Sequence, residues 1–148
     1  MTQLNFPAYA FSIKVINDKP HIFDQLRKKF VALQPEEWVR QHMIQYLIEE
    51  KKYPASLMNN EISLSYNGMQ KRCDSVVYDR NGKALMIIEY KAPTEKISQK
   101  TFDQIVLYNS QLLVNYLLIS NGLSHYCCQI NPDNSCSFLK DIPLYENL

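Results

Sequence analysis

The chain has 148 residues, 46% of them hydrophobic and 21% charged, with a formal net charge of +1. This length suits one packed domain, and the composition excludes disordered, collagen-like and coiled-coil chains. We expect a single domain over residues 1–148, with a core at about 33–122, an N-terminal strand and turn extension at 1–32, and further strands at 124–148.

Three further features narrow the class of protein. No apolar run approaches the ~18 residues of a membrane-spanning helix, so we expect no membrane association. The near-zero net charge does not indicate a protein that coats nucleic acid, so a polyanion would be bound by a local site. The four cysteines contain no C-x-x-C pair, which favours buried thiols in a reduced, cytoplasmic protein.

The N-terminal region predicts little regular structure. Alternating apolar and polar residues at 11–15 predict a short strand, and residues 17–20 predict a turn. Residues 24–33 contain the basic triplet 27–29 between apolar positions, with a period that fits one helical turn as well as a strand. We expect irregular structure with a basic face there, and the triplet is either solvated surface or a set of phosphate contacts.

The clearest helix is predicted at residues 35–52. Pro35 suits the first helical turn, where its missing N–H costs nothing, and Glu36 and Glu37 favour the positive end of the helix dipole. The apolar stripe through Ile44 leads back to Glu37, which we therefore expect on the buried side.

The remaining elements predict one mixed sheet. Three strands joined by short turns form an antiparallel meander, at 62–66, 72–78 and 84–90. Ser98 is a good N-cap for a second helix that reaches about residue 115. Three more strands are expected, at 116–120, 124–130 and 136–139. A helix-length crossover permits parallel pairing, so the strand after it is expected to lie parallel to one strand of the meander in an α/β domain.

Ionisable side chains interrupt the second and third strands of the meander. Glu89 and Lys91 are two apart in a strand and share a face, and an even-length turn places Asp74 on that face opposite or diagonal to Glu89. Two close carboxylates need a shared proton or cation, and Mg²⁺ binds one or two carboxylates together with substrate phosphate. This predicts a magnesium site for phosphodiester hydrolysis, although a Glu and a Lys at this spacing are otherwise typical of a solvated ion pair.

The sequence resembles a known nuclease family. Asp74, fourteen intervening residues and the triplet Glu89-Tyr90-Lys91 are similar to the D…E-x-K core of the PD-(D/E)XK nuclease superfamily. Four ordered motifs resemble the N-terminal nuclease domain of type I restriction enzyme R subunits, namely residues 35–41, Cys73-Asp74, residues 89–93 and Gln104-x-x-x-Tyr108. The resemblance covers about residues 33–122 and implies a restriction-endonuclease-like fold and a Mg²⁺-dependent endonuclease that hydrolyses DNA, with Mn²⁺ as an alternative ion.

The resemblance also implies roles for single residues. Asp74 and Glu89 correspond to the metal ligands, with the Tyr90 carbonyl as a third, and Lys91 corresponds to the catalytic lysine. Glu37 corresponds to the helix carboxylate that assists the metal or its water, and Glu36 is the competing choice. Contacts to substrate are expected from four polar residues, namely Arg40, Gln41, Gln104 and Tyr108.

Two departures from the family leave an alternative function open. Cys73 replaces the proline of the family motif, and the chain contains neither the ATP-driven motor of the R subunits nor a phosphate-binding glycine loop, so no ATP site is expected. A non-catalytic module that retains the fold and binds nucleic acid or a protein partner is the alternative. For a nuclease we expect DNA as partner, with a homodimer or a larger restriction or repair complex for cleavage of both strands.

Overall fold

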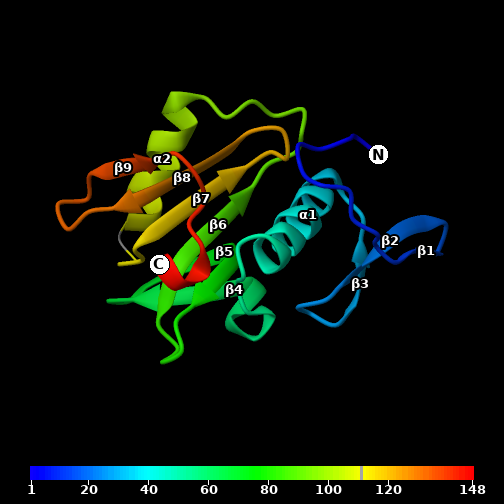
Figure 1. Ribbon diagram of the computed structural model, residues 1–148, viewed down its shortest axis with the longest axis horizontal. Coiled ribbons are helices and arrows are strands. Elements are labelled where there is room, and N and C mark those ends of the chain that lie inside the picture. The colour runs from blue at the N-terminus through cyan, green and yellow to red at the C-terminus, as the bar shows by residue number, and fades with distance from the viewer. Residues whose placement is uncertain (111) are drawn as a thin grey trace.

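The computed structural model describes residues 1–110 and 112–148, without the side chains of Tyr108 and Ser110. Its strands form a six-stranded mixed sheet and a smaller three-stranded antiparallel sheet (Figure 1). The predicted fold class, a restriction-endonuclease-like mixed sheet flanked by helices, is confirmed. Among the described residues, none of the helices has the length and apolar character that crossing a membrane requires.

The small sheet consists of β1 (Ile13–Ile16), β2 (Lys19–Asp24) and β3 (Lys29–Ala32). The prediction of irregular structure over residues 24–33 is therefore wrong in part. Asp24 closes the β2–β3 hairpin, because its carboxylate accepts hydrogen bonds from the N–H groups of Leu26 and Arg27 at 2.7 and 2.8 Å. Lys28 completes this turn in the left-handed region, with φ of 56°.

Helix α1 (Pro35–Glu49) begins where the sequence predicted and ends before the expected residue 52. Lys52 adopts the left-handed region with φ of 62°, which stops the helix. The N–H of Tyr53 then bonds to the carbonyl of Leu47 at 3.0 Å. A short 3-10 turn, Ala55–Leu57, leads into the large sheet.

The large sheet has its strands in sequence order: β4 (Met58–Tyr66), β5 (Met69–Tyr78), β6 (Ala84–Tyr90), β7 (Tyr116–Ser120), β8 (His125–Ile130) and β9 (Cys136–Leu139). The meander of β4 to β6 and the parallel pairing of β7 with β6 are confirmed. β4 and β5 begin earlier than predicted, at Met58 and Met69. β5 begins at Met69 because Asn67 and Gly68 both have positive φ and form a tight turn that pairs Tyr66 with Met69.

Helix α2 (Gln99–Ser110) crosses from β6 to β7. Its predicted N-cap is confirmed, since the hydroxyl of Ser98 accepts a hydrogen bond from the N–H of Thr101 at 3.2 Å. The helix is shorter than predicted, because Leu113 lies in the left-handed region with φ of 55°. A last 3-10 turn, Tyr145–Asn147, ends the chain near α1.

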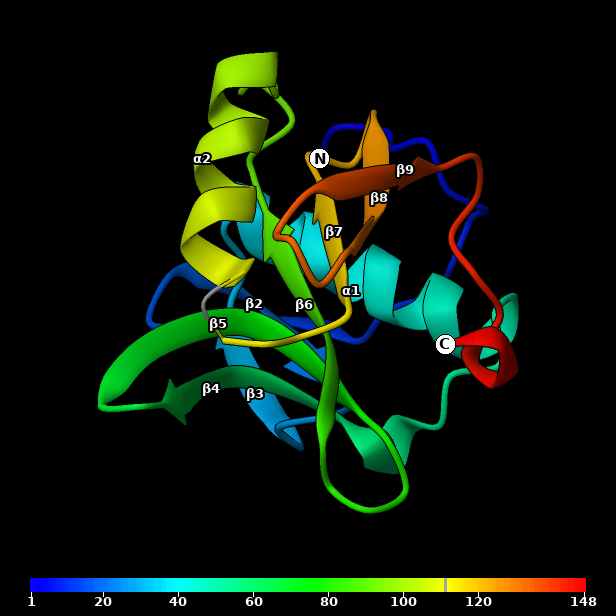
Figure 2. The same ribbon diagram turned by 90° about the vertical axis from the view of Figure 1, so that its left-hand side faces the viewer.

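The two helices cover opposite faces of the large sheet (Figure 2). The core under α1 includes Met43, Leu47, Ile88 and Leu118, and the core under α2 includes Val76, Ile87, Phe102 and Val106. Successive residues of β6 thus enter different cores, which fixes this strand from both sides. The small sheet lies beside α1, to which β3 connects directly (Figure 1).

Candidate active site

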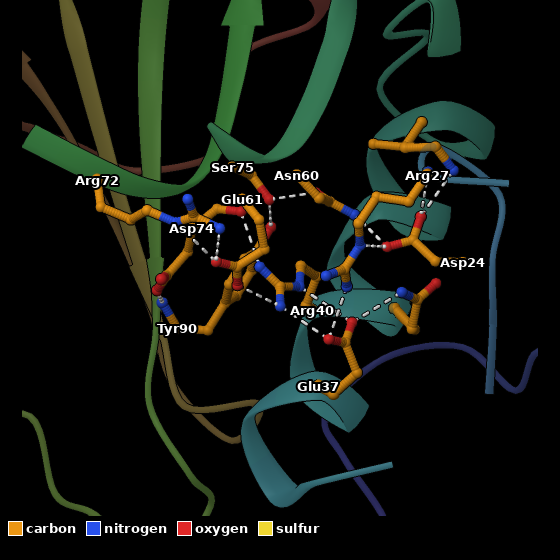
Figure 3. Close-up of polar contacts among 12 residues, drawn as sticks. Asp24, Arg27, Glu37, Arg40, Asn60, Glu61, Arg72, Asp74, Ser75 and Tyr90 are labelled. Carbon is orange, nitrogen blue, oxygen red and sulfur yellow. Dashed lines mark hydrogen bonds and ion pairs between the residues drawn. The ribbon is translucent and has the colours of Figure 1, made fainter. Parts of the chain in front are cut away.

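Two carboxylates lie opposite each other on neighbouring strands. β5 and β6 are antiparallel, with Ser75 opposite Ile88, and the next step along this register places Asp74 opposite Glu89. Directly opposite side chains lie on one face of a sheet. The N–H of Tyr90 donates a hydrogen bond to Asp74 Oδ2 at 2.9 Å, which holds this carboxylate beside the end of β6 (Figure 3). The structure therefore brings together the two acids that the sequence predicted as metal ligands.

The environment of Glu89 shows crowding of like charges. Burial and the neighbouring Asp74 raise the pKa of Glu89 above its ordinary value of 4.5. The ammonium of Lys71 opposes this effect, since its Nζ lies 2.8 Å from Glu89 Oε1. A nearby cation stabilises such a pair of acids, and the ammonium of Lys71 already places one positive charge beside Glu89.

Lys71 is a residue of the site that sequence reasoning missed. It stands three positions before Asp74, and strict alternation places such residues on opposite faces of a strand. β5 departs from strict alternation, because Cys73 and Val76 pack in the same apolar cluster. Residues 71–76 contain neither glycine nor proline that would indicate this irregularity.

Lys91 follows β6 and faces an open hollow. Its Nζ lies 3.9 Å from Glu95 Oε2, and its side chain is 33% exposed, so the ammonium remains accessible. The hollow measures about 350 Å³ and is lined by Lys71, Glu89, Lys91, Gln104, Ile105 and Asn109. Helix α2 thus contributes Gln104 to the space beside Glu89 and Lys91. The side chain of Tyr108, the other predicted contact from α2, lies outside the described residues.

Glu36 lies within electrostatic reach of the strand residues. Its side chain is at the surface, in the first turn of α1. Partial burial and the charge of Asp74 raise the pKa of Glu36, whereas the charge of Lys91 lowers it. The helix therefore presents one acid toward the predicted metal ligands, and this acid is the first of the pair.

Glu37 instead lies in a buried set of protein contacts, with 6% of its surface exposed. Its carboxylate accepts hydrogen bonds from Arg27 at 2.7 Å, from Arg40 at 2.7 and 3.0 Å, and from Gln41 at 2.9 Å. Burial acts to raise the pKa of Glu37. The hydrogen bonds and the charge of Arg40, followed by the hydrogen bonds of Gln41 and Arg27, outweigh burial, so the pKa of Glu37 lies below its ordinary value. The sequence placed Glu37 on the buried side but could not show that its oxygens face protein donors.

Arg40 connects Glu37 to the backbone of Asp74. Its Nη1 donates a hydrogen bond to the Asp74 carbonyl at 2.8 Å, and its Nη2 lies 2.8 Å from Glu61 Oε1. Glu61 has φ of 55° and interrupts the pairing of β4 with β5, so the opposite carbonyl of Asp74 faces Arg40. The guanidinium is buried, and it contacts the protein on all of these sides. Arg40 and Gln41, predicted as substrate contacts, are thus both engaged within the protein.

The hydrogen bonds and ion pairs around Glu37 and Arg40 continue to the small sheet (Figure 3). Asp24 is fully buried and accepts hydrogen bonds from Arg27 Nε and from Asn60 Nδ2, the latter at 2.9 Å. Burial opposes its charge, but these bonds lower the pKa of Asp24 below its ordinary value. Because Arg27 also bonds to Glu37, polar contacts run continuously from the β2–β3 hairpin through α1 to the backbone of Asp74.

The acid pair fits a hard divalent cation. Over residues 1–110 and 112–148, no group of three His, Cys, Asp or Glu is arranged to hold a metal ion, and the predicted site itself contains two acids, Asp74 and Glu89. Mg²⁺ is bound in proteins by one or two carboxylates and retains several waters. The hydroxyl of Tyr90 donates a hydrogen bond to Ser75 Oγ at 2.9 Å, so the Tyr90 side chain is engaged within the protein. Burial and the charge of Asp74 both raise the pKa of Glu89, and a divalent cation would stabilise the ionised form against both effects.

Comparison with known proteins identifies the family. A family described as the type I restriction enzyme R protein N terminus (HSDR_N) matches residues 35–143. No curated protein matches the chain. A solved fragment of a protein assigned as an HsdR subunit of a type I restriction enzyme from Vibrio vulnificus YJ016 is 15% identical, with a TM-score of 0.52. The match covers 76% of this chain and 25% of that one, so this chain spans a quarter of its length.

Two further solved structures are similar to smaller degrees. A protein from Anabaena variabilis ATCC 29413, assigned as a nuclease of the DUF820 group, is 10% identical with a TM-score of 0.48, over 88% of this chain and 84% of that one. DrdV in complex with DNA is 15% identical with a TM-score of 0.44, over 72% of this chain and 10% of that one. The family match includes the segments that hold Asp74, Glu89 and Lys91 and leaves residues 1–34 outside. The chain belongs to the family of the type I restriction enzyme R protein N terminus.

Proposed function

We propose that this chain is a Mg²⁺-dependent endonuclease domain that hydrolyses phosphodiester bonds in DNA. The observation that carries the proposal is the pair of opposed carboxylates, Asp74 and Glu89, beside Lys91 at the edge of an open hollow. Membership of a restriction enzyme family supports the same chemistry. Mn²⁺ has similar ligand preferences and is expected to replace Mg²⁺.

Asp74 and Glu89 hold the cation in this proposal, with the Tyr90 carbonyl as a third ligand. A bound divalent ion lowers the pKa of a coordinated water and polarises a phosphoryl oxygen. Lys91 lies on the face of Glu89 and is accessible, so its ammonium can stabilise the negative charge that develops on the phosphate. Gln104 reaches the same hollow from α2 and can donate to a phosphate oxygen, and we retain Tyr108 as its predicted companion.

We assign the role of the helix carboxylate to Glu36 in place of Glu37. Glu36 is at the surface and interacts with both Asp74 and Lys91, which suits a group that accepts a proton from the attacking water. The hydrogen bonds of Glu37 go to Arg27, Arg40 and Gln41. We therefore propose Glu37, Arg40 and Gln41 as positioning residues that act through the backbone of Asp74.

The proposal extends to the form in which the domain works. We propose that residues 1–148 act as one domain in the cytoplasm, where the four free cysteines stay reduced. One chain presents one pair of metal ligands, so cleavage of both DNA strands requires a homodimer or a larger restriction or repair complex.

A second candidate function is a non-catalytic module that binds nucleic acid or a protein partner. The observation that favours it is the ion pair of Lys71 with Glu89, because at 2.8 Å the ammonium occupies one oxygen of a predicted metal ligand. In this case Lys71 replaces the metal as the partner of the acid pair.

A plasmid nicking assay separates the two candidates. We expect the wild type to nick supercoiled DNA with Mg²⁺ or Mn²⁺ and not with a chelator, and Asp74→Ala and Lys91→Ala to lower the rate by about a hundredfold or more. Asp141→Ala and Lys140→Ala remove the same charges at exposed positions outside the hollow and should leave the rate unchanged. A wild type that does not nick with either ion would contradict the nuclease and favour the non-catalytic module. Site variants that nick at the wild-type rate would contradict the assignment of Asp74 and Lys91 to the reaction.

A further inference from the structure

The small sheet concentrates the positive charge of the chain. Residues 12–32 contain five of the 16 Lys and Arg residues and two of the 15 acidic residues, which gives this segment +3. Subtracting this value from the total of +1 leaves −2 for the remainder of the chain. One of the two acids, Asp24, is buried and paired with Arg27, whereas Lys14, Lys19 and Lys28 are exposed.

Two phenylalanines lie side by side on the outward face of this sheet. Phe23 is paired with Phe30 across β2 and β3, with ring centroids 5.3 Å apart. Ile22, the preceding residue, is fully buried, so Phe23 points to the opposite face, where it is 38% exposed.

Lysines surround these rings on the same face. Lys14 and Lys19 occupy outward positions by the register of β1 with β2, in which Lys14 is opposite His21 and Ile16 is opposite Lys19. The ammonium of Lys14 lies 4.1 Å from the centroid of the Phe30 ring. The outward face of the sheet therefore combines accessible aromatic surface with exposed positive charges. We call these four residues, Lys14, Lys19, Phe23 and Phe30, the basic aromatic face.

This face is fixed to the candidate active site. Arg27, from the β2–β3 turn, donates to Glu37 at 2.7 Å, and Asp24 is bonded to Asn60 of β4 at 2.9 Å. β3 ends at Ala32 and α1 begins at Pro35, so the sheet adjoins the helical turn that carries Glu36. A ligand held on the sheet is therefore carried on the same body as Asp74.

We propose that the basic aromatic face binds a single-stranded segment of a polynucleotide. Aromatic side chains stack with unpaired bases while lysines contact the phosphates, which is how proteins hold single strands without sequence preference. A duplex keeps its bases stacked on each other and offers none to Phe23. The face lies within residues 1–34, outside the segment that the family shares. The inference rests on the proposed function for its role, since it names the form of substrate that the site receives.

Fluorescence anisotropy with a chelator present tests this inference without cleavage. The probes are labelled oligo-dT and oligo-rU of about 20 nucleotides and a DNA duplex of equal length. Phe23→Leu should weaken single-strand binding about fivefold or more, and the Lys14→Gln/Lys19→Gln variant should lower the slope of log Kd against log salt by about 1.4. Oligo-dT and oligo-rU differ in the sugar and in the 5-methyl group of the base, so equal binding shows that neither group matters to this face.

Matched controls remove the same groups elsewhere on the surface. Phe138→Leu alters a ring that is 55% exposed, and Lys83→Gln/Lys140→Gln removes two exposed charges, so both should bind like the wild type. Asp74→Ala should bind single strands at least as tightly as the wild type, which separates this inference from the nuclease proposal. The inference is overturned if the wild type does not bind single strands, if the face variants bind like the wild type, or if Phe23→Leu weakens duplex binding equally.

Discussion

Asp74 has different partners for its side chain and its backbone. Its carboxylate lies opposite Glu89 and accepts a hydrogen bond from the N–H of Tyr90 at 2.9 Å. Its carbonyl accepts a hydrogen bond from Arg40, which is itself paired with Glu37. The position of this proposed metal ligand is therefore determined by β6 on one side and by α1 on the other. Hydrogen bonds from the protein to a metal-binding residue orient that residue and affect metal affinity.

Replacement of Arg40 tests this positioning role. Arg40→Gln leaves the buried Glu37 without its main partner, so we expect the free energy of unfolding to fall by about 3 kcal/mol and Mn²⁺ to bind about tenfold more weakly. Arg40→Lys keeps a positive charge near Glu37 but cannot donate to two partners as a planar guanidinium does, so it should restore stability more than metal affinity.

Urea unfolding and Mn²⁺ titration of the folded variants measure the two effects of Arg40 separately. Arg72→Gln is the control, since Arg72 is 65% exposed and pairs with Glu61 at 3.2 Å, so it removes an arginine at the surface. Unchanged Mn²⁺ affinity in folded Arg40→Gln would show that Arg40 stabilises the fold without positioning the ligand.

Simple rules predict the acid pair from the sequence but not the role of each acid in α1. Alternation along the strands and the even-length turn place Asp74 and Glu89 together, and the register confirms this. A helical stripe also predicts that Glu37 is buried. It cannot show that Arg27 arrives from a separate hairpin to bind Glu37, because this contact spans two elements whose relative positions depend on the whole fold.

The β2–β3 hairpin is the element that joins the small sheet to the site. Asp24 closes its turn and bonds to Asn60 of β4. Its pKa in the folded protein is lower than the ordinary value of 3.8, despite burial, because Arg27 and Asn60 donate to its carboxylate. The unfolded chain therefore takes up a proton at this residue more readily than the folded chain does.

Acid unfolding tests the anchoring of this hairpin. The stabilisation from the Asp24 carboxylate is fully present above pH 3.8 and is lost as the pH falls below 3.8 through the folded pKa. We expect Asp24→Asn to be less stable than the wild type at neutral pH and to lose less stability on acidification. Urea unfolding over a series of pH values measures both, with Asp141→Asn as an exposed control. An Asp24→Asn variant with the acid dependence of the wild type would contradict the anchoring role.

Local signals predict where the two helices begin better than where they end. Pro35 and Ser98 mark the starts of both helices, and the apolar runs of β6 and β7 are bounded as predicted. The ends of the helices involve Lys52 and Leu113 in the left-handed region, which neither residue type favours intrinsically. Residue type alone therefore does not predict where these helices end.

Positive and negative charges are concentrated in different parts of the molecule. The segment that matches the family begins at residue 35 and contains the acid pair. Residues 12–32, which form the small sheet before it, carry a net charge of +3. The near-zero net charge of the chain is therefore the sum of a basic surface on the small sheet and an acidic remainder that contains the site. The sequence showed the basic triplet at 27–29, but only the structure shows that Arg27 turns inward while the outward lysines lie beside Phe23 and Phe30.

Isothermal titration of Mg²⁺ and Mn²⁺ measures whether Asp74 and Glu89 bind a divalent ion. We predict one binding event in the wild type that is lost in Asp74→Ala and in Glu89→Gln and retained in Lys91→Ala and in Asp141→Ala. Circular dichroism verifies that each variant is folded. Equal metal binding by the wild type and folded Asp74→Ala, or none by the wild type, would show that Asp74 and Glu89 do not form a metal site.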